Sequence, residues 1–435
     1  MENYTYIETY GCSANQNNSE IIAGLLKQSG TEITNNQDIA DIIIINSCAV
    51  KSKTENKIKR RIQDLEKTNK LLIITGCMSD TDAKYIKKLN KNSIFLGSHH
   101  IKGILNLIRD YKESKLDDKK QLEYVSFNKE EKILLPKIPQ NKLISITQIL
   151  EGCLMNCTYC KTKLAKGDLF SYPEEDIVKS IESDLKNGAK EVWLTSQDNS
   201  VYGLDRNTNL PNLLKKILNL NYNFKLRLGM ANPGHFYYIL DEMIEVYRHP
   251  KMYKFLHIPI QSGSDKILKE MKRLYKKETV EKIISRFREK FPDITIATDI
   301  IIGYPTETDY DFKESMDFVK EFRPDVLNLS KFSKHKRTAA EKLKDINIKI
   351  VNKRNLDIMR EHRRTALENK QKFLNKEINI FVNKKITENG FYEARDENYN
   401  IILIPITNEN KNILGKNIKV LIEKTGVHHM IGKVV

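Results

Sequence analysis

The chain has 435 residues, of which 40% are hydrophobic and 30% are charged, a composition that excludes a disordered protein and predicts two or three globular domains. No apolar run approaches the roughly 20 residues of a membrane-spanning helix, and the first residues lack the charged and apolar regions of a signal peptide, so we expect a cytoplasmic protein. The formal net charge of +16 favours a polyanionic partner, nucleic acid first, although abundant lysine is also typical of a solvated surface.

Short β-branched runs alternate with amphipathic stretches over residues 1–112. The runs TYIETY, DIIIINS and LLIITG predict strands, and the stretches between them predict the helices of a parallel α/β domain. Cys12, Cys48 and Cys77 each follow one of these strands, at the sheet edge where binding sites are usually built. A single cysteine there is most often a buried small hydrophobe. Three that converge at one edge indicate an iron-sulfur cluster with one open iron.

Residues 113–142 are rich in charge, contain the prolines of LLPKIPQNK and show no sustained periodicity, so we expect a linker there. Beyond it, six strand-like runs extend from ISITQIL to VLNLSKF, with helical stretches between most of them. This alternation predicts an α/β domain over residues 143–333 that forms an open or partial (β/α)6 barrel.

Three cysteines at C-x-x-x-C-x-x-C spacing, Cys153, Cys157 and Cys160, directly follow the first strand of this barrel. A structural zinc site normally closes with four ligands, whereas a 4Fe-4S cluster held by three cysteines leaves one iron open for a substrate molecule. An open iron can chelate the amino and carboxylate groups of S-adenosylmethionine (SAM), whose reductive cleavage yields a 5′-deoxyadenosyl radical. The motif therefore predicts a radical SAM site, and a zinc site or a partly buried thiol cluster is the less favoured interpretation.

Residues 334–373 carry 13 Lys or Arg against 5 Asp or Glu, half of the net charge, and have the pattern of a helical segment. Residues 374–435 alternate in short strands with turn residues between them, which predicts a small β-barrel. His428 and His429 have no spaced partner residues and are interpreted as part of a surface turn.

Eight motifs are spread over most of the first 310 residues: TYGCSANQNNSE, INSCAV, TGCM, EGCLMNCTYCKTKLAKG, LTSQDNSVYG, LRLGMANP, HIPIQSGS and ATDIIIGYPTET. They resemble the motifs of the tRNA methylthiotransferases, and the C-terminal strands resemble the small RNA-binding TRAM barrel that ends such proteins. The segments CTYCKTKLAKG, LTSQDNSVYG and GMANP are most similar to the archaeal and eukaryotic branch, which acts on N6-threonylcarbamoyladenosine beside the tRNA anticodon.

The resemblance implies two 4Fe-4S clusters. The three N-terminal cysteines would bind an auxiliary cluster from which sulfur is delivered, and the three motif cysteines would bind the cluster that cleaves SAM. One SAM would methylate sulfur on the auxiliary cluster, and a second would generate the radical that removes hydrogen from adenine C2. The implied protein is a monomer that modifies tRNA, has no membrane partner, and receives electrons from a donor such as flavodoxin or ferredoxin.

Several polar residues at the strand ends have a functional and an ordinary interpretation. Gln197 and Asp198 could bind the SAM amino group, and the backbone at Gly303 could approach its adenosyl portion closely. In the ordinary interpretation, all three residues only shape loops at the strand ends. Arg227 lies inside an apolar strand, so we expect a carboxylate or substrate partner for it. Gln261 is expected to share the barrel-facing side of its strand with His257. A histidine in such a place is more often a core residue with its hydrogen bonds satisfied than a catalytic one.

Other residues have weaker assignments. Asn15 could lie near the N-terminal cysteines or simply cap a helix. Lys331, Lys334, Lys336 and Arg337 follow the last barrel strand and could contact tRNA phosphates at the barrel mouth.

Two other acceptors and one other class of protein remain open. The same chemistry could act on an isopentenyl-type adenosine of tRNA or on a ribosomal protein aspartate, but the basic segment favours RNA over protein. A non-catalytic RNA-binding protein with structural metal would require four-ligand sites, which six cysteines in two sets of three fit poorly.

Overall fold

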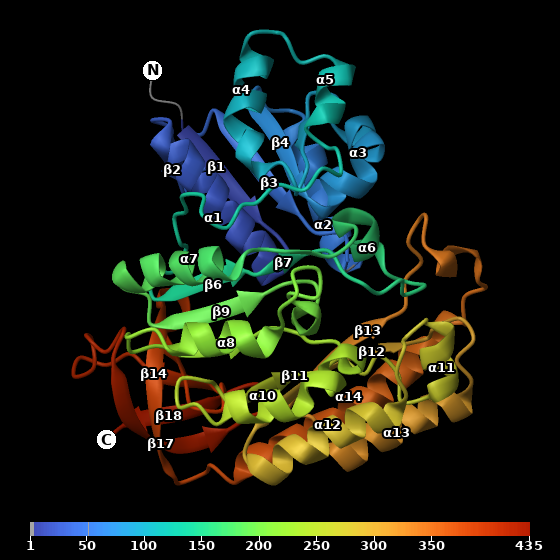
Figure 1. Cartoon of the computed structure of the whole chain (residues 1–435), viewed down its shortest axis with the longest axis vertical. Coiled ribbons are helices and arrows are strands. Elements are labelled where there is room, and N and C mark those ends of the chain that lie inside the picture. The colour runs from blue at the N-terminus through green and yellow to red at the C-terminus, as the bar shows by residue number, and fades with distance from the viewer. Residues whose placement is uncertain (1–3, 51) are drawn as a thin grey trace.

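The computed structural model describes residues 4–50 and 52–435 as an N-terminal α/β region, a central partial barrel and a C-terminal β-barrel (Figure 1). This architecture confirms the predicted fold class. Within these described ranges, no helix has both the length and the apolar character that crossing a membrane requires.

The N-terminal region is a five-stranded parallel sheet in the order β2-β1-β3-β4-β5. Its strands are β1 (Tyr4–Thr9), β2 (Glu32–Thr34), β3 (Ile42–Ser47), β4 (Leu71–Gly76) and β5 (Ile94–Leu96). Its helices are α1 (Ser13–Gln28), α2 (Ser52–Leu65), α3 (Cys77–Leu89), the 3-10 helix η1 (Ile101–Gly103) and α4 (Ile104–Lys112). Strand β3 is buried at every position because helices cover both faces of the sheet.

Two separate cores account for this burial. Ile43 and Ile45 of β3 pack in the core shared with α2 and α3, whereas Ile42 and Ile44 pack in the core shared with α1 and α4. The isoleucine run thus serves both faces, which is why it shows no alternation in the sequence.

Residues 113–142, where we expected a linker, form a packed connection between the two regions. The segment contains the short helix α5 (Asp118–Glu123) and then runs along α1. Ile138 N donates to Glu20 O at 2.9 Å, and Gln140 N donates to the Glu20 carboxylate at 3.2 Å. Lys132 in this segment is only 1% exposed, so part of it belongs to the protein interior.

The central region contains all six strands that the sequence predicts for the barrel. They form two parallel sheets, β10-β9-β6 and β11-β12-β13. The strands are β6 (Ile144–Gln148), β9 (Glu191–Thr195), β10 (Lys225–Leu228), β11 (Phe255–His257), β12 (Thr295–Ile302) and β13 (Val326–Lys331). A bridge between Leu226 and Met252 joins the sheets, and no described pairing joins β6 to β13, so the barrel is open.

Most helices of this region cover the outside of the barrel, whereas α6 (Lys161–Lys166) packs on α3 of the N-terminal region, and one short antiparallel strand pair lies at the barrel edge. The pair is β7 (Leu150–Glu151) with β8 (Phe170–Ser171). The helices are α6 (Lys161–Lys166), α7 (Glu174–Lys186), η2 (Asn199–Val201), α8 (Leu210–Leu218), α9 (Pro233–Phe236), η3 (Tyr237–Ile239), α10 (Leu240–Tyr247), α11 (Asp265–Glu270), α12 (Lys277–Lys290) and α13 (Asp309–Phe322). The N-terminal region is attached to the barrel through α1, since Asn17 Nδ2 donates to Ile146 O of β6 at 2.7 Å.

The basic segment is partly helical. After the short helix η4 (Ala339–Lys342), the long helix α14 (Ile348–Gln371) lies beside α13 and β13 and buries Val351, Ile358 and Ala366. Arg354 also points inward, where it is paired with Glu307 at 2.6 Å. Most of the other basic residues of α14 face solvent, as a solvated helix face requires.

The last region is a closed five-stranded barrel in the order β14-β15-β16-β18-β17. Its elements are β14 (Glu377–Ile386), η5 (Thr387–Asn389), β15 (Phe391–Arg395), β16 (Ile401–Pro405), β17 (Asn417–Thr425) and β18 (Met430–Val434). Alternate residues such as Ile380, Val382, Ile402 and Ile404 fill its core. The small β-barrel predicted from the strand pattern is therefore confirmed.

Candidate active site

A cavity of about 1000 Å³ lies at the carboxyl ends of the central strands. Its wall includes residues of the N-terminal region, such as Thr54, and residues of α14, such as Asn355. All three motif cysteines line it, and so do Gln197, Asp198 and Gln261. The structure thus brings together most of the residues that the sequence suggested for a SAM site.

The cysteine motif forms the loop between β7 and α6, and its three thiols are free and partly exposed. Each sulfur accepts a hydrogen bond: Cys153 from Met155 N at 3.3 Å and Cys160 from Lys163 N at 3.4 Å. Cys157 accepts one from Arg273 Nη1 at 3.4 Å. Bonds of this kind stabilise thiolate sulfur, which is the form that binds iron.

The environment of Cys153 requires a cation if the thiol is to ionise. Burial raises the pKa of Cys153 to about 12, with further contributions from Asp198 and from the neighbouring cysteines. A thiol with this pKa stays protonated near neutral pH unless a metal displaces the proton. The donor set is all sulfur and therefore suits iron-sulfur chemistry.

Asp198 provides a free acceptor for a cationic ligand. Its Oδ1 accepts from Ser200 N and Asn232 N, both at 3.0 Å, while its buried Oδ2 has no hydrogen-bond partner. The side chain is 1% exposed and lines the cavity, and burial raises its pKa. An amino group is the natural partner for such an oxygen, so the site fits the charged end of SAM.

Gln197 and Gln261 contribute in different ways. Gln197 Oε1 accepts from Gly152 N at 2.9 Å and thereby holds the start of the cysteine loop. Gln261 has a φ of 72°, a left-handed backbone conformation that residues other than glycine rarely adopt. Its backbone bonds to Asp299 O at 2.8 Å and to Ile301 N at 2.9 Å hold that strained conformation at the cavity wall.

Arg227 and Gly303 lie outside the cavity wall. The Arg227 guanidinium is stacked among three aromatic rings, 5.8 Å from Trp193, 5.1 Å from Phe255 and 5.5 Å from Tyr399. Because Tyr399 belongs to the C-terminal barrel, this arginine joins that barrel to the central sheet. Its partners are aromatic rings and not the expected carboxylate.

Gly303 has a packing role. Its φ is 73°, and a Cβ at this position would lie 2.7 Å from the Val351 side chain of α14. Glycine therefore allows α14 to approach the end of β12, and Gly303 N donates to Glu307 at 2.9 Å.

The three N-terminal cysteines follow β1, β3 and β4, whose neighbouring ends are in register. Cys48 and Cys77 are buried and Cys12 is exposed. Gly11, with φ of 105°, lets the first turn pass close to Cys48, because a Cβ there would lie 3.1 Å from the Cys48 sulfur. Asn15 Nδ2 donates to Tyr10 O at 2.8 Å and to Ser47 O at 3.0 Å, so it connects two of these turns and is not a helix cap.

The spacing of possible metal ligands can be compared with the spacing that a single metal ion requires. Among the described residues, no group of three or more His, Cys, Asp or Glu side chains has the spacing of one metal ion. The thiols that hold an iron-sulfur cluster each bind a different iron atom, so they are spread more widely than zinc ligands. Each set consists of three sulfur donors, a donor set that suits an iron-sulfur cluster.

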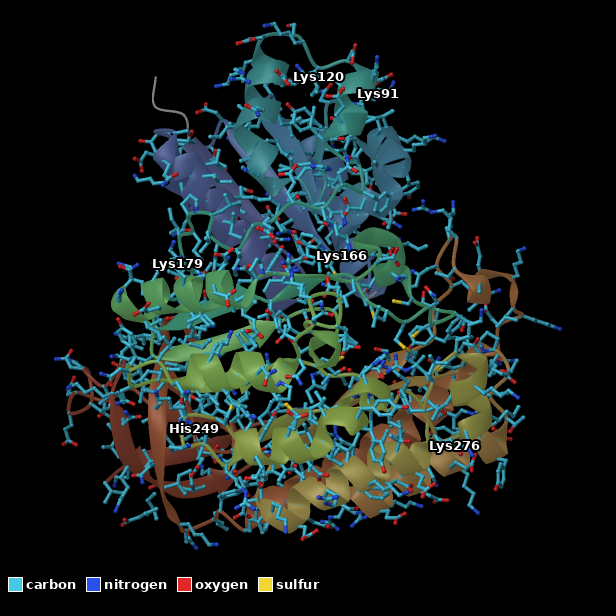
Figure 2. The ribbon with its side chains drawn as sticks, in the orientation of Figure 1. Lys91, Lys120, Lys166, Lys179, His249 and Lys276 are labelled. Carbon is cyan, nitrogen blue, oxygen red and sulfur yellow. The ribbon has the colours of Figure 1, made fainter. Side chains whose placement is uncertain are left out.

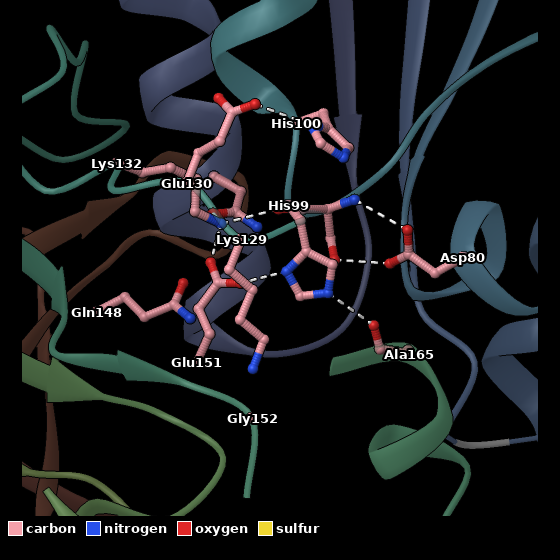
Figure 3. A network of polar contacts seen from close by, with 12 residues as sticks. Asp80, His99, His100, Lys129, Glu130, Lys132, Gln148, Glu151, Gly152 and Ala165 are labelled. Atoms are coloured by element: carbon pink, nitrogen blue, oxygen red, sulfur yellow. Dashed lines mark hydrogen bonds and ion pairs between the residues drawn. The ribbon is translucent and has the colours of Figure 1, made fainter. Parts of the chain in front are cut away.

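A buried polar network connects the two sets of cysteines (Figure 3). His99, just after β5, contacts Glu151 of β7 at 2.6 Å through Nδ1 and Ala165 O of α6 at 3.0 Å through Nε2. Glu151 also accepts from Tyr172 at 3.0 Å and is paired with Lys132. Burial alone would raise the pKa of Glu151, but Lys132 and His99 outweigh it and hold that pKa well below its usual value.

The network extends to both sites. Asp80, three residues after Cys77, accepts from Ser98 N at 3.1 Å and from Ser98 Oγ at 2.6 Å. Glu151 lies two residues before Cys153. The contacts between these loops therefore fix how the N-terminal cysteines are positioned relative to the motif cysteines.

Sequence reasoning missed Arg273 and Lys166, which both line the cavity. Arg273 follows α11 in the run MKRLYKK, where one arginine among lysines gives no signal of burial. Lys166 ends α6, and only the close sequence distance to Cys160 could have drawn attention to it.

Two family models match the chain. The model of uncharacterized protein family UPF0004 matches residues 4–97, and the model of the radical SAM superfamily matches residues 147–319. The first match ends at the loop after β5, and the second covers most of the central barrel.

Curated relatives match nearly the whole chain. A probable threonylcarbamoyladenosine tRNA methylthiotransferase of Pyrococcus abyssi is 38% identical over 405 residues, which cover 93% of this chain and 94% of the relative. The threonylcarbamoyladenosine tRNA methylthiotransferase of Homo sapiens is 35% identical over 440 residues, which cover 98% of this chain and 73% of the relative.

A solved structure shares the fold. The radical S-adenosylmethionine methyltransferase TsrM from Kitasatospora setae, with cobalamin and a [4Fe-4S] cluster bound, superposes with a TM-score of 0.58 at 12% identity, covering 78% of this chain and 77% of that chain. At this identity the likeness supports the fold alone.

Proposed function

The chain belongs to the family of radical SAM threonylcarbamoyladenosine tRNA methylthiotransferases, and on that premise we propose that it converts N6-threonylcarbamoyladenosine beside the tRNA anticodon to its 2-methylthio derivative. One observation carries the proposal most directly. Two sets of three cysteines follow the strand ends of two sheets, a buried network ties their loops together, and the second set lines the cavity.

We propose that each set holds a 4Fe-4S cluster. Cys153, Cys157 and Cys160 would carry the cluster that binds SAM, and the three N-terminal cysteines would carry the auxiliary cluster. When bound, these clusters and SAM supply the radical that removes hydrogen from adenine C2 and the sulfur that replaces it. Support comes from the donor sets, which consist of sulfur alone.

The residues of this chain orient and shield the reaction. Asp198 Oδ2 would accept from the SAM amino group, while Gln197 holds the cysteine loop through Gly152 N. Arg273 fixes Cys157 by its hydrogen bond. The apolar part of the cavity wall, which would keep water from a reactive centre, is formed by Ile300, Ile301, Leu329 and Phe332.

A groove of about 850 Å³ beside the cavity offers a surface for the RNA. It shares Met155 and Arg273 with the cavity wall, and its rim contains the exposed side chains of Leu154 and Leu274. Its cations are Lys266, Lys269, Lys272, Arg273 and Lys276. Phosphates would bind to such cations, and an apolar rim suits the stacking of an unpaired base.

The groove cations are better placed for RNA than most of the cations after the last barrel strand. Within the described structure, Lys269, Lys272 and Lys276 have no ion-pair partner, whereas Lys334 is paired with Asp345 at 3.2 Å. Two of the other cations there are also engaged: Lys331 donates to Asn352 at 2.5 Å, and Arg337 donates to Thr81 O at 2.8 Å.

We assign one function to each domain that the sequence predicts. Residues 1–112 would hold the auxiliary cluster, residues 143–333 the SAM site and residues 374–435 an RNA-binding barrel, with 113–142 and 334–373 as connections. We propose that the protein acts as a monomer. The reaction consumes electrons, so we propose a donor such as flavodoxin or ferredoxin. Because the proposed substrate is tRNA, we also propose a cytoplasmic location.

The test is mass spectrometry of nucleosides from tRNA that carries threonylcarbamoyladenosine. The reconstituted protein is incubated anaerobically with this tRNA, SAM, sulfide and reductant, beside the Cys12→Ala variant. We expect the 2-methylthio product from the wild type alone. SAM cleavage without a methylthio base would refute this substrate and point to an isopentenyl-type adenosine or a ribosomal aspartate. No SAM cleavage would refute the reaction.

The groove is tested by tRNA binding. The test variant combines Lys269→Glu, Lys272→Glu and Lys276→Glu. It should weaken tRNA binding more than tenfold and reduce the slope of log affinity against log salt concentration by an amount that corresponds to about three phosphate contacts. A matched control carries the same charge change on α14, as Lys349→Glu, Lys353→Glu and Arg360→Glu. Equal losses in both variants would mean that net charge, and not the groove, governs binding.

A further inference from the structure

Lys166 is a buried cation without a partner. It is the last residue of α6, is 1% exposed, and its Nζ has no hydrogen-bond acceptor among the described residues. Figure 2 shows it where the N-terminal region meets the central barrel. An unpaired ammonium inside a protein is strongly destabilising, so a partner is expected.

The buried Lys132 gives a direct comparison. Its ammonium is paired with Glu151 and donates to Ser98 O at 2.8 Å, so its charge is compensated within the protein. Lys166 lies in the same part of the interior and lacks such contacts. The difference indicates that the partner of Lys166 is a bound group.

The neighbours of Lys166 include two of the N-terminal cysteines. Its ammonium interacts electrostatically with Glu151, Cys77, Asp80 and Cys12. Glu151 is already engaged with His99, Tyr172 and Lys132. Both Asp80 oxygens accept from Ser98. The sulfur atoms of Cys77 and Cys12 are the neighbours that remain.

The backbone of α6 is held over these cysteines. Ala165 packs in the core that contains Cys48, Cys77 and Met78, and its carbonyl contacts His99 Nε2 at 3.0 Å. Lys166 also contributes to the wall of the cavity that the motif cysteines line. The ammonium is therefore located between the two sets of cysteines.

We infer that Lys166 is the cation beside the N-terminal cysteine site and compensates the negative charge of the iron-sulfur group bound there. This inference rests on the proposed function. Three thiolates outweigh the positive charge of an oxidised 4Fe-4S core, so the bound group is an anion whose charge grows on reduction. A fixed ammonium beside it stabilises the group and raises its reduction potential. Lys166 is thus a positioning residue for sulfur delivery.

The potential of the N-terminal group tests this role. The full chain carries Cys153→Ala, Cys157→Ala and Cys160→Ala, so that only the N-terminal cysteines can bind iron, and is compared with the same protein after Lys166→Met or Lys166→Arg. An anaerobic redox titration is followed by electron paramagnetic resonance. We expect Lys166→Met to lower the equilibrium constant for reduction about tenfold, which is about 59 mV for one electron, and Lys166→Arg to stay within about twofold.

Unfolding of the iron-free protein provides a second readout. Without the bound anion, Lys166 Nζ has no hydrogen-bond acceptor in the described part of the chain. Glu151 and Asp80 favour its charge without a direct ion pair, so Lys166→Met should lower the midpoint of thermal unfolding less than a change that breaks a direct ion pair. The matched control is Lys161→Met on the same helix, because Lys161 is buried but paired with Asp82 at 2.6 Å. That variant should lower the midpoint.

The outcomes separate the inference from the proposed function. If the protein without motif cysteines binds iron and sulfide, but Lys166→Met keeps the wild-type potential, the role of Lys166 is refuted and the auxiliary cluster stands. If Lys166→Met destabilises the iron-free protein as much as Lys161→Met does, Lys166 is structural and the inference fails. If no iron binds to the N-terminal cysteines, the two-cluster function and this inference both fail.

Discussion

His99 Nδ1 lies 2.6 Å from Glu151 Oε2 in a fully buried contact between the loop after β5 and the short strand β7, which directly precedes the motif cysteines. No sequence pattern relates these two residues, which are separated by 52 positions. Their contact nonetheless links the loop after β5 to the strand that leads into the motif cysteines, as Figure 3 shows. The alignment of the two proposed clusters therefore depends on it.

Replacing Glu151 by Gln should destabilise the fold. The change removes the charge that compensates the buried Lys132, so we expect a loss of about 3–5 kcal/mol in the free energy of unfolding. Denaturant unfolding of the iron-free protein measures it. The double variant Glu151→Gln with Lys132→Met should recover much of the loss, and a double variant as unstable as the single one would show that the charge pair is not the cause.

The free oxygen of Asp198 predicts a defect in SAM binding. Asp198→Asn keeps one oxygen for Ser200 and Asn232 but loses the negative charge, so the dissociation constant for SAM should rise about 10- to 100-fold. Isothermal titration of the reconstituted protein gives this constant. Asp241→Asn on the surface serves as the control, and equal affinity of the Asp198 variant would rule out a contact with the amino group.

The aromatic surroundings of Arg227 predict coupling between the barrel and the central sheet. Arg227→Met and Tyr399→Leu should each cost about 2 kcal/mol, and the double variant should cost much less than the sum because both changes remove the same contact. Chemical unfolding measures these free energies, and limited proteolysis after α14 reports release of the barrel. Additive effects would show that the two side chains act independently.

Burial of Glu20 predicts a pH dependence of stability. It raises the pKa of Glu20 from 4.5 to about 7, while the side chain bonds to the Gln140 backbone. Because the folded state binds this proton more tightly than the unfolded state, stability falls as pH rises from about 4.5 to 7, by about 3 kcal/mol in total. The cost is fully present above pH 7.

The Glu20→Gln variant checks this sign. Urea unfolding at pH 5 and pH 8 should show a smaller difference for the variant than for the wild type, and a higher stability of the variant at pH 8. The exposed Glu32, which is paired with Lys27, provides the control, since Glu32→Gln should leave the difference unchanged. A pH response of Glu20→Gln equal to that of the wild type would contradict the assignment.

Much of the fold could be predicted from local patterns. The isoleucine run of β3 and the six central strands were found because buried parallel strands consist of short apolar runs separated by turn residues. The edge strands β2 and β5 were missed, since three residues each are too short to show a pattern. The connection over residues 113–142 has a polar sequence but is packed, because its contacts are made with α1 and with Glu151, far away in the chain.

The candidate site was predictable only where residue type alone carries chemistry. Cysteine spacing marks a metal site in any sequence, and Asp198 was suggested by its place at a strand end. Arg227 was found but misinterpreted, because its aromatic partner Tyr399 comes from another domain. Lys166 was missed because one buried lysine has the same appearance in the sequence as the many exposed ones, and only its short distance from Cys160 sets it apart.

The late position of α6 in the chain has a consequence for how the protein is made. During synthesis the N-terminal cysteine set is complete once Cys77 has left the ribosome. Lys166 and the rest of α6 follow only after the connection over residues 113–142 and the first barrel strand, β6. At about 5–20 residues per second, that interval lasts several seconds. Until then, the edge of the sheet that carries Cys48 and Cys77 lacks the cover that α6 provides in the folded chain.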